Sequence, residues 1–169
     1  RKNLIIEIRT KSAFFYSIKD MKPSKGVILS WTLSPETICK EYEIGAPPLV
    51  KRLNAVSEAL SKGWRVRLCF DPILLIKNWE TIYNRFIDDV FSQIKTEKLR
   101  DVTIGVFRMN KDYFNRIRKR ESRSVLYYKN YVIEKGTVTV EKNERQEALK
   151  KIESKISYYL PKDKILVWS

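Results

Sequence analysis

Val66-Arg67-Leu68-Cys69-Phe70-Asp71-Pro72-Ile73 is a short apolar run that ends in an acidic residue and a proline. This pattern is typical of a strand that is buried on both faces and whose carboxyl end meets a ligand. Pro72 has no backbone N–H, so it is predicted to stop the strand and to leave Asp71 at the tip. The stretches Leu4–Ser12 and Val27–Ser34 share the pattern. Together the three tips predict one site at the C-terminal edge of a parallel sheet.

Helical and extended patterns alternate along the rest of the chain. Apolar spacing predicts helices over 13–19, 35–42, 49–60, 79–94, 111–119 and 144–159, and strands over 102–107, 138–140 and 165–168. Ser34 is the expected N-cap of the second helix with Pro35 as its first residue, and Gly63 is the expected cap after the third. Residues 121–129 read as a polar linker. The aromatic stripe over 79–94 is interpreted as core. This alternation predicts an α/β fold, a parallel sheet with covering helices.

Composition narrows the possible functions. The 169 residues fit one domain, and 34 Lys and Arg against 20 Asp and Glu give a formal net charge of +14. Such an excess favours a polyanionic partner such as nucleic acid, although a solubility role or a general lysine bias gives the same count. The chain has no histidine, which excludes within it a classical hydrolase triad and a His-based zinc site.

Localisation and cysteine usage point to the same compartment. The longest apolar run is too short to cross a bilayer, and no signal-peptide pattern is present, so a cytoplasmic protein without a membrane partner is expected. Cys39 and Cys69 form no disulfide framework and suit a reducing compartment. Cys69 lies between Leu68 and Phe70 and is interpreted as a small core residue rather than a nucleophile.

Several motifs resemble those of one enzyme family. In chain order they are Glu7-Ile8-Arg9-Thr10-Lys11-Ser12, Leu29-Ser30-Trp31-Thr32-Leu33-Ser34-Pro35, Glu43-x-Gly45 with Arg52-Leu53-x-Ala55, Gly63-Trp64, Phe70-Asp71-Pro72-Ile73 and Asp101-Val102-x-x-Gly105-x-x-Arg108. In their order and spacing, over roughly the first half of the chain, they resemble the spore photoproduct lyase family of radical S-adenosylmethionine (radical SAM) enzymes. The tail after Arg120 adds little to the resemblance.

The resemblance implies the second half of a partial (β/α)6 TIM-like barrel in residues 1–120, with 121–169 as a C-terminal extension that packs on the same domain. From the sequence alone, a small doubly wound sheet remains the alternative. An incomplete barrel has an open lateral edge, so the missing N-terminal half of the same enzyme, or a homodimer through that edge, is the expected partner.

The resemblance also implies a [4Fe–4S] cluster and S-adenosylmethionine in the full-length protein. The cluster needs three thiolates close together, whereas Cys39 and Cys69 stand thirty positions apart. No metal or cofactor is therefore expected in this chain alone, which reads as a fragment whose cluster-bearing half precedes Arg1. Isolated, it is expected to be inactive.

Cofactor contacts follow from the resemblance. Lys11 is implied to meet the cofactor carboxylate, Ser30 or Ser34 its amino-acid or ribose groups, and the backbone from Asp71 to Ile73 its adenine. A solvated loop lysine is the alternative for Lys11. No catalytic residue is assigned within the chain.

Substrate contacts are expected from two groups of cations. Arg9, Arg67 and Arg108 could line the substrate pocket and meet phosphates, although a structural role, such as a Glu7–Arg67 ion pair, is the favoured interpretation. The basic helix combines cations with aromatic residues, which predicts DNA contact; a solvated charged face is the alternative. Its predicted DNA-binding residues are Lys111, Arg116, Lys119 and Arg120.

The implied activity is repair of a cross-linked thymine pair in DNA. A 5′-deoxyadenosyl radical, made by reductive cleavage of S-adenosylmethionine, would abstract hydrogen from this thymine photoproduct, which makes the full-length protein a lyase. A hypothesis of another class stays open: a non-enzymatic, basic nucleic-acid-binding α/β domain.

Overall fold

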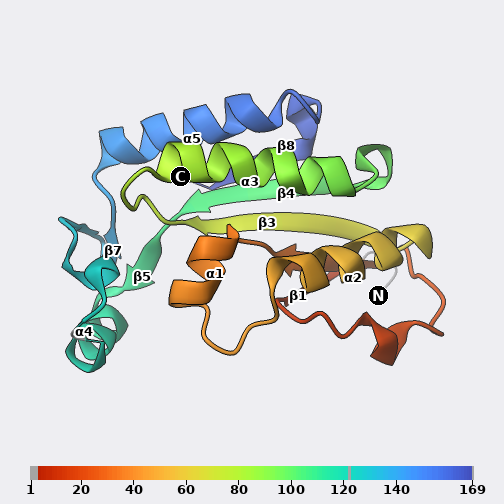
Figure 1. Cartoon of the computed structure of the whole chain (residues 1–169), viewed down its shortest axis with the longest axis horizontal. Coiled ribbons are helices and arrows are strands. Elements are labelled where there is room, and N and C mark those ends of the chain that lie inside the picture. Colours follow the sequence, from red (N-terminus) through yellow and green to blue (C-terminus); the bar gives the residue numbers. More distant parts are fainter. Residues whose placement is uncertain (1–3, 122, 169) are drawn as a thin grey trace.

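A five-stranded parallel sheet forms the centre of the molecule (Figure 1). The computed structural model describes residues 4–121 and 123–168. The strands are arranged in the order β1-β2-β3-β4-β8. Their bounds are β1 (Ile6–Thr10), β2 (Val27–Thr32), β3 (Arg65–Ile73), β4 (Asp101–Val106) and β8 (Ile165–Trp168). All four neighbouring pairs are parallel, as the alternation predicts.

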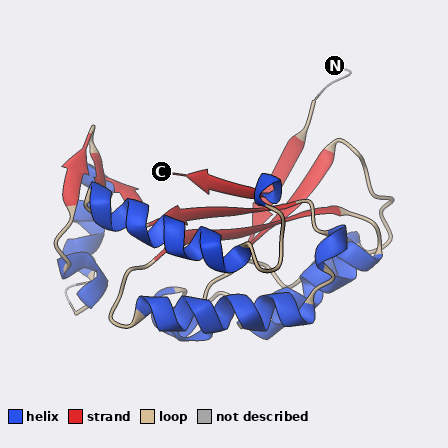
Figure 2. Cartoon of the chain, turned by 90° about the horizontal axis from the view of Figure 1, so that it is seen from above, coloured by secondary structure: helices blue, strands red, loops and turns tan. Residues whose placement is uncertain are grey.

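Helices cover one face of this sheet, as Figure 2 shows. They are α1 (Glu36–Tyr42), α2 (Leu49–Ser61), α3 (Trp79–Gln93) and α5 (Lys142–Ile156). Alternate residues of β3 explain the asymmetry, because Val66, Leu68 and Phe70 are fully buried in the core while Arg67 lies on the other face. A doubly wound sheet has helices on both faces and a reversal of strand order. Neither feature occurs in the described residues, so the arrangement is that of part of a (β/α) barrel.

The aromatic stripe of α3 is part of the core, as predicted. Phe86 meets Phe70 of β3 edge to face, with ring centroids 5.0 Å apart. The hydroxyl of the buried Tyr83 accepts a hydrogen bond from the backbone N–H of Leu74. Helix α3 is thereby fixed against the end of β3. Phe91 of the same helix stacks on Tyr159, which follows α5.

A small antiparallel sheet stands at the carboxyl end of β4. Its order is β5-β7-β6, with β5 (Arg108–Asn110), β6 (Val132–Glu134) and β7 (Thr137–Thr139). The sequence predicted a strand only over 138–140, within a run of β-branched residues, whereas β5 and β6 are equally short and have no such run. Helix α4 (Lys111–Arg120) follows β5, and its N-cap is Asn110, whose side chain accepts hydrogen bonds from the N–H groups of Asp112 and Tyr113.

Short 3-10 helices fill four connections. They are η1 (Phe15–Ile18), η2 (Thr96–Lys98), η3 (Val125–Tyr128) and η4 (Lys162–Lys164). The helix expected over 13–19 is therefore wrong except for one turn. The Ser12 hydroxyl accepts the Phe14 N–H, a local turn that competes with a helix start. Within the expected linker 121–129, η3 is ordered, and residue 122 lies outside the described residues.

Two expectations for the strands need correction. β1 is not buried on both faces, since Ile6 and Ile8 are each 49% exposed. The reason is that β1 is an edge strand with one neighbour, β2. Pro72 does not stop β3 either: the register shifts between Phe70 and Ile73, and Ile73 then pairs with Val106 of β4. Proline thus interrupts the ladder locally without ending the strand.

Helix ends agree with expectation to within one residue except in α5, which begins at Lys142 and ends at Ile156 instead of spanning 144–159, and in the cap of α1. Ser34 is not its N-cap; Pro35 takes that position, and the Ser34 hydroxyl donates to Glu43 instead. Helix α2 ends before Gly63, whose φ of +86° suits glycine. In the described part of the chain, no helix is both long enough and apolar enough to cross a membrane.

Candidate functional site

The polar tips of β1, β2 and β3 meet at one edge of the sheet, on the face that the helices leave open. Register pairs Arg9 with Ser30 and Ser30 with Arg67, which places the two arginines on either side of the serine. Ser30 is completely buried, and within the described residues its hydroxyl has no hydrogen-bond partner. The structure therefore brings the predicted substrate and cofactor residues of these strands together, although Ser30 lies inside the strand and not at its tip.

Asp71 anchors two arginines at this edge. Its carboxylate receives two hydrogen bonds from Arg108, Nη1–Oδ1 at 2.9 Å and Nη2–Oδ2 at 3.0 Å. The Arg9 guanidinium lies 3.6 Å from the same carboxylate. The Asp71 side chain is 7% exposed, whereas Arg9 and Arg108 are each more than 40% exposed. This cluster holds one negative and two positive charges, so its accessible part is cationic.

Arg67 is engaged in a structural network. Its Nη2 donates to Asp101 Oδ2 over 2.9 Å, and its Nη1 donates to Glu7 Oε2 over 2.7 Å. The side chain is 12% exposed, and the hydrogen bonds that the guanidinium donates to Asp101 raise its pKa above the ordinary value of arginine. The Glu7–Arg67 pair considered from the sequence is present, and Asp101 is a partner that the sequence reasoning missed. Asp101 stands opposite Arg67 in the β3–β4 register, which only the structure reveals.

Glu43 gathers side chains from three separate elements. It accepts hydrogen bonds from Lys11 over 2.9 Å, from Ser34 over 2.8 Å and from Arg52 over 2.7 Å. Burial alone would raise the pKa of Glu43, but these donors outweigh burial and hold the pKa below its ordinary value. Arg52 is itself 0% exposed and also donates to the carbonyls of Pro47 and Thr32. This cluster fixes where Lys11 and Ser34 lie.

The predicted cofactor residues differ in access. Lys11 is 42% exposed, so its ammonium can reach a ligand while Glu43 holds its position. Ser34 is buried and donates to Glu43. The Ile73 side chain is fully buried, and its carbonyl accepts the Phe107 N–H. The structure thus presents Lys11 on the surface at the tip of β1 and keeps Ser34 and Ile73 inside.

The cysteines do not fit an iron–sulfur cluster. Cys39 and Cys69 are both buried and free, and the described residues contain no group of three or more Cys, His, Asp or Glu side chains suited to a metal ion. Burial, aided by the Glu43 carboxylate, raises the pKa of the Cys39 thiol to about 11. Burial likewise raises the pKa of Cys69. Both thiols are therefore protonated at neutral pH and behave as core residues.

The predicted DNA-binding residues lie on helix α4, beyond the carboxyl end of β4 (Figure 1). Lys111, Arg116, Lys119 and Arg120 are exposed. The Arg116 guanidinium lies over the Tyr113 ring, 5.6 Å from its centroid, while Phe114 is buried. Figure 1 shows α4 with the small sheet, beyond the carboxyl end of β4. The helix therefore has one buried aromatic face and one cationic face on the side of the molecule where the strands end.

Solved structures of spore photoproduct lyase share this fold. Spore photoproduct lyase complexed with dinucleoside spore photoproduct superposes with a TM-score of 0.83 and 17% sequence identity. A variant of this enzyme with bound AdoMet and dinucleoside spore photoproduct superposes with a TM-score of 0.82, also at 17% sequence identity. Each match covers 96% of this chain and 50% of that chain, so the chain spans about half the length of these proteins. No family model and no curated protein matches the sequence. The chain therefore has the fold of about half of spore photoproduct lyase, the α/β half-barrel to which its sequence motifs point.

Proposed function

We propose that this chain is half of a radical SAM enzyme, similar to spore photoproduct lyase, that repairs a thymine photoproduct in DNA. The observation that carries the proposal is the fold match over 96% of the chain to a structure with bound AdoMet and dinucleoside spore photoproduct. The exposed Lys11 and the arginine pair on Asp71 support it, because they lie on the strand edge where barrel enzymes place their sites.

Lys11 is the residue of this chain best suited to hold S-adenosylmethionine. The cofactor, when bound, supplies the 5′-deoxyadenosyl radical that abstracts hydrogen from the substrate. The Lys11 ammonium would bind its carboxylate in a charge-assisted hydrogen bond. Glu43 would keep that ammonium in place through their 2.9 Å contact. The backbone from Asp71 to Ile73 would border the adenine.

The [4Fe–4S] cluster belongs to a different part of the protein. Cys39 and Cys69 are buried, so neither thiol fits as a cluster ligand. We infer that the cluster-bearing half pairs with β1, whose edge and exposed Ile6 and Ile8 have no covering element in the described residues. A homodimer through the same edge is the alternative partner. A cytoplasmic location suits the two free cysteines.

The cations divide between two substrate roles. Arg9 and Arg108 face the open side of the sheet and would meet a phosphate next to the lesion. The exposed cations of α4 would track the phosphates of the surrounding DNA. Arg67 would act indirectly, because Glu7 and Asp101 already occupy its guanidinium.

The coding sequence upstream of Arg1 tests the proposal. We expect it to encode a loop with three clustered cysteines, and the 169-residue chain incubated with iron and sulfide should show no iron–sulfur absorbance. An upstream region without such a loop would favour the other hypothesis, a non-enzymatic DNA-binding domain, for which the basic face of α4 is the supporting feature. A stable cluster on this chain alone would contradict the assignment of its cysteines to the core.

A further inference from the structure

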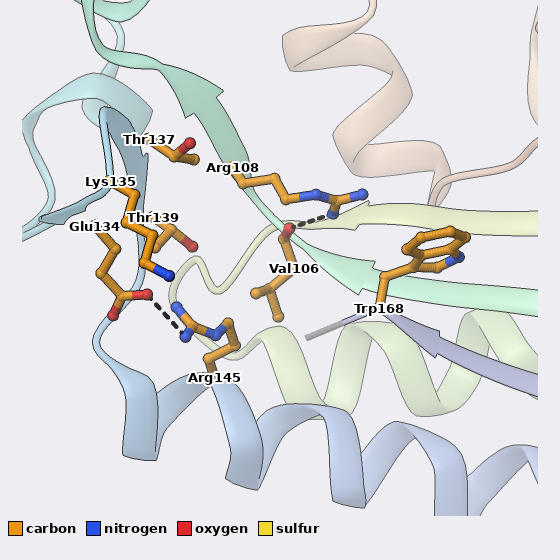
Figure 3. Close-up of a pocket in the computed structure, with 8 residues that line it drawn as sticks. All are labelled: Val106, Arg108, Glu134, Lys135, Thr137, Thr139, Arg145 and Trp168. Carbon is orange, nitrogen blue, oxygen red and sulfur yellow. Dashed lines mark hydrogen bonds and ion pairs between the residues drawn. The ribbon is translucent and has the colours of Figure 1, made fainter.

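A cavity of about 590 Å³ lies between the main sheet and the small sheet (Figure 3). Its volume is within the range of pockets that hold small molecules. The lining comes from the ends of β4 and β8, the three elements β5 to β7, and α5. The lining residues are Val106, Arg108, Glu134, Lys135, Thr137, Thr139, Arg145 and Trp168.

The cavity has three cations and one carboxylate. Arg145 is occupied, since it donates to Glu134 over 3.1 Å and to the Val140 carbonyl over 3.0 Å. Arg108 is held by Asp71 and by the Val106 carbonyl, and its exposed part belongs to the arginine pair already assigned to the open face of the sheet. Lys135 differs from both, because it has no ion pair with any residue that the structure describes. Its positive charge is therefore available to an anionic ligand.

The backbone at Lys135 is unusual for a lysine. Lys135 and Gly136 form the two-residue turn between β6 and β7, with φ of +48° and +79°. Two positive φ angles define a type I′ turn, in which asparagine, aspartate or glycine is favoured at the first position. A lysine at this position is less favourable for folding than asparagine or glycine, which suggests that its side chain has a function in addition to forming the turn. Figure 3 shows that side chain beside the Glu134–Arg145 pair, within the cavity.

Trp168 supplies an aromatic wall at the other end of the cavity, across from the hairpin (Figure 3). Its side chain is 56% exposed, in contrast to Trp31 and Trp64, which are at most 5% exposed. An accessible indole offers a flat surface on which a nucleobase stacks. The same cavity therefore joins a free cation to an aromatic surface, the two groups that recognise a nucleotide.

We propose that this cavity binds a nucleoside phosphate, with the phosphate on Lys135 and the base stacked on Trp168. The pocket chemistry stands on its own geometry; that the nucleotide belongs to a DNA strand rests on the proposed function. The site is distinct from the face of α4, whose cations do not line the cavity.

The test uses the 169-residue chain with two probes, thymidylate and a short single-stranded thymidine oligonucleotide. The indole N–H signals of the four tryptophans are followed by NMR during titration, and Trp168→Phe assigns the relevant signal. We expect both probes to shift the Trp168 signal. Equal affinity for the two would identify a free nucleotide as the ligand, and much tighter binding of the oligonucleotide would identify a strand.

Lys135→Asn separates binding from folding. Asparagine suits the type I′ turn, so the unfolding midpoint should stay the same or rise, while the dissociation constant for thymidylate should rise about tenfold through the loss of a charge-assisted contact. Lys22→Asn removes an equal charge from an exposed loop and should leave binding unchanged. An unmoved Trp168 signal, or wild-type affinity in Lys135→Asn, would overturn the assignment. The proposed function is tested separately, by photoproduct repair with the product of the complete gene, so its failure and failure of this pocket give different results.

Discussion

Arg108 of β5 and Asp71 of β3 form a two-pronged ion pair just beyond the carboxyl end of β4, and Gly105 of β4 makes room for it. A methyl group on Gly105 would lie 2.7 Å from Arg108 Nη1 and 3.0 Å from Asp71 Oδ1. Both separations are closer than side-chain atoms normally approach. The pair, together with Arg9, forms the cationic cluster on the open face of the sheet.

Gly105→Ala should disturb this ion pair. We expect the free energy of unfolding to fall by about 1 to 2 kcal/mol, because the new methyl group overpacks the space under the guanidinium. In an Arg108→Ala background the guanidinium is absent, so the added methyl group has no clash with it. Gly105→Ala should then lower the free energy of unfolding by less than it does in the wild type. Urea denaturation of the four proteins of this double-mutant cycle measures the difference. An equal cost in both backgrounds would show that the clash with Arg108 is not its cause.

Glu43→Gln should remove much of the acid sensitivity of the fold. The folded state holds the pKa of Glu43 below its ordinary value of 4.5, so ionised Glu43 stabilises the protein above that pH. This contribution is lost as the pH falls through the lower, folded-state pKa. At pH 7 the free energy of unfolding of the variant should be about 3 kcal/mol below that of the wild type, since the buried Arg52 loses its charged partner. When the pH is lowered, the stability of the variant should fall less than that of the wild type.

The Glu43 prediction is checked by urea denaturation at neutral and acidic pH. Glu58→Gln is the control, because Glu58 is exposed on α2 and forms no ion pair in the described residues. The free energy of unfolding of Glu58→Gln should depend on pH in the same way as that of the wild type. If the wild type and Glu43→Gln lost the same stability on acidification, Glu43 would not be the titrating group.

Lys11→Ala should weaken S-adenosylmethionine binding in the product of the complete gene, reconstituted with iron and sulfide. The loss of one charge-assisted contact is expected to cost about 1.5 to 3 kcal/mol in binding free energy. Calorimetric titration measures it, and Lys22→Ala serves as the control for a lost surface charge. An unchanged dissociation constant would remove Lys11 from the cofactor site.

Replacing four cations of α4 with alanine should reduce affinity for duplex DNA. The variant carries Arg116→Ala, Arg118→Ala, Lys119→Ala and Arg120→Ala. The slope of log affinity against log salt should flatten by about 0.9 for each lost phosphate contact. Fluorescence anisotropy over a salt series measures both quantities.

A charge-matched control decides whether the α4 effect is local. Four exposed lysines elsewhere are replaced by alanine: Lys22, Lys51, Lys62 and Lys150. This control lowers the net charge equally and should lose less affinity. If both variants lost the same affinity for DNA, α4 would contribute to DNA binding only through the net charge of the protein.

The main sheet was predictable because its strands are apolar runs flanked by turns and amphipathic helices. The strand tips could likewise be placed at one edge, since parallel strands end together. The small sheet could not be predicted as a whole, because β5 pairs with β7 far along the chain, Arg108 with Thr139 and Asn110 with Thr137. Exposure of β1 was also missed, because an apolar run does not reveal whether its strand lies at an edge.

The polar clusters show where sequence reasoning stops. Glu43 and Arg52 were noticed only as parts of a motif, yet they hold Lys11 and Ser34 through contacts between residues up to 32 positions apart. Lys135 and Trp168 carried no signal in the sequence, because only the folded chain places them at opposite ends of one cavity (Figure 3). Such sites depend on the tertiary arrangement and not on local spacing.

The central claim is tested most directly by repair of a thymine photoproduct. The product of the complete gene is incubated with S-adenosylmethionine, a reductant and an oligonucleotide that contains one spore photoproduct, and the digested DNA is analysed by chromatography. We predict that the photoproduct disappears and that two thymines are restored without strand cleavage. A protein with an intact iron–sulfur cluster and bound S-adenosylmethionine that left the photoproduct unchanged would contradict the proposed function.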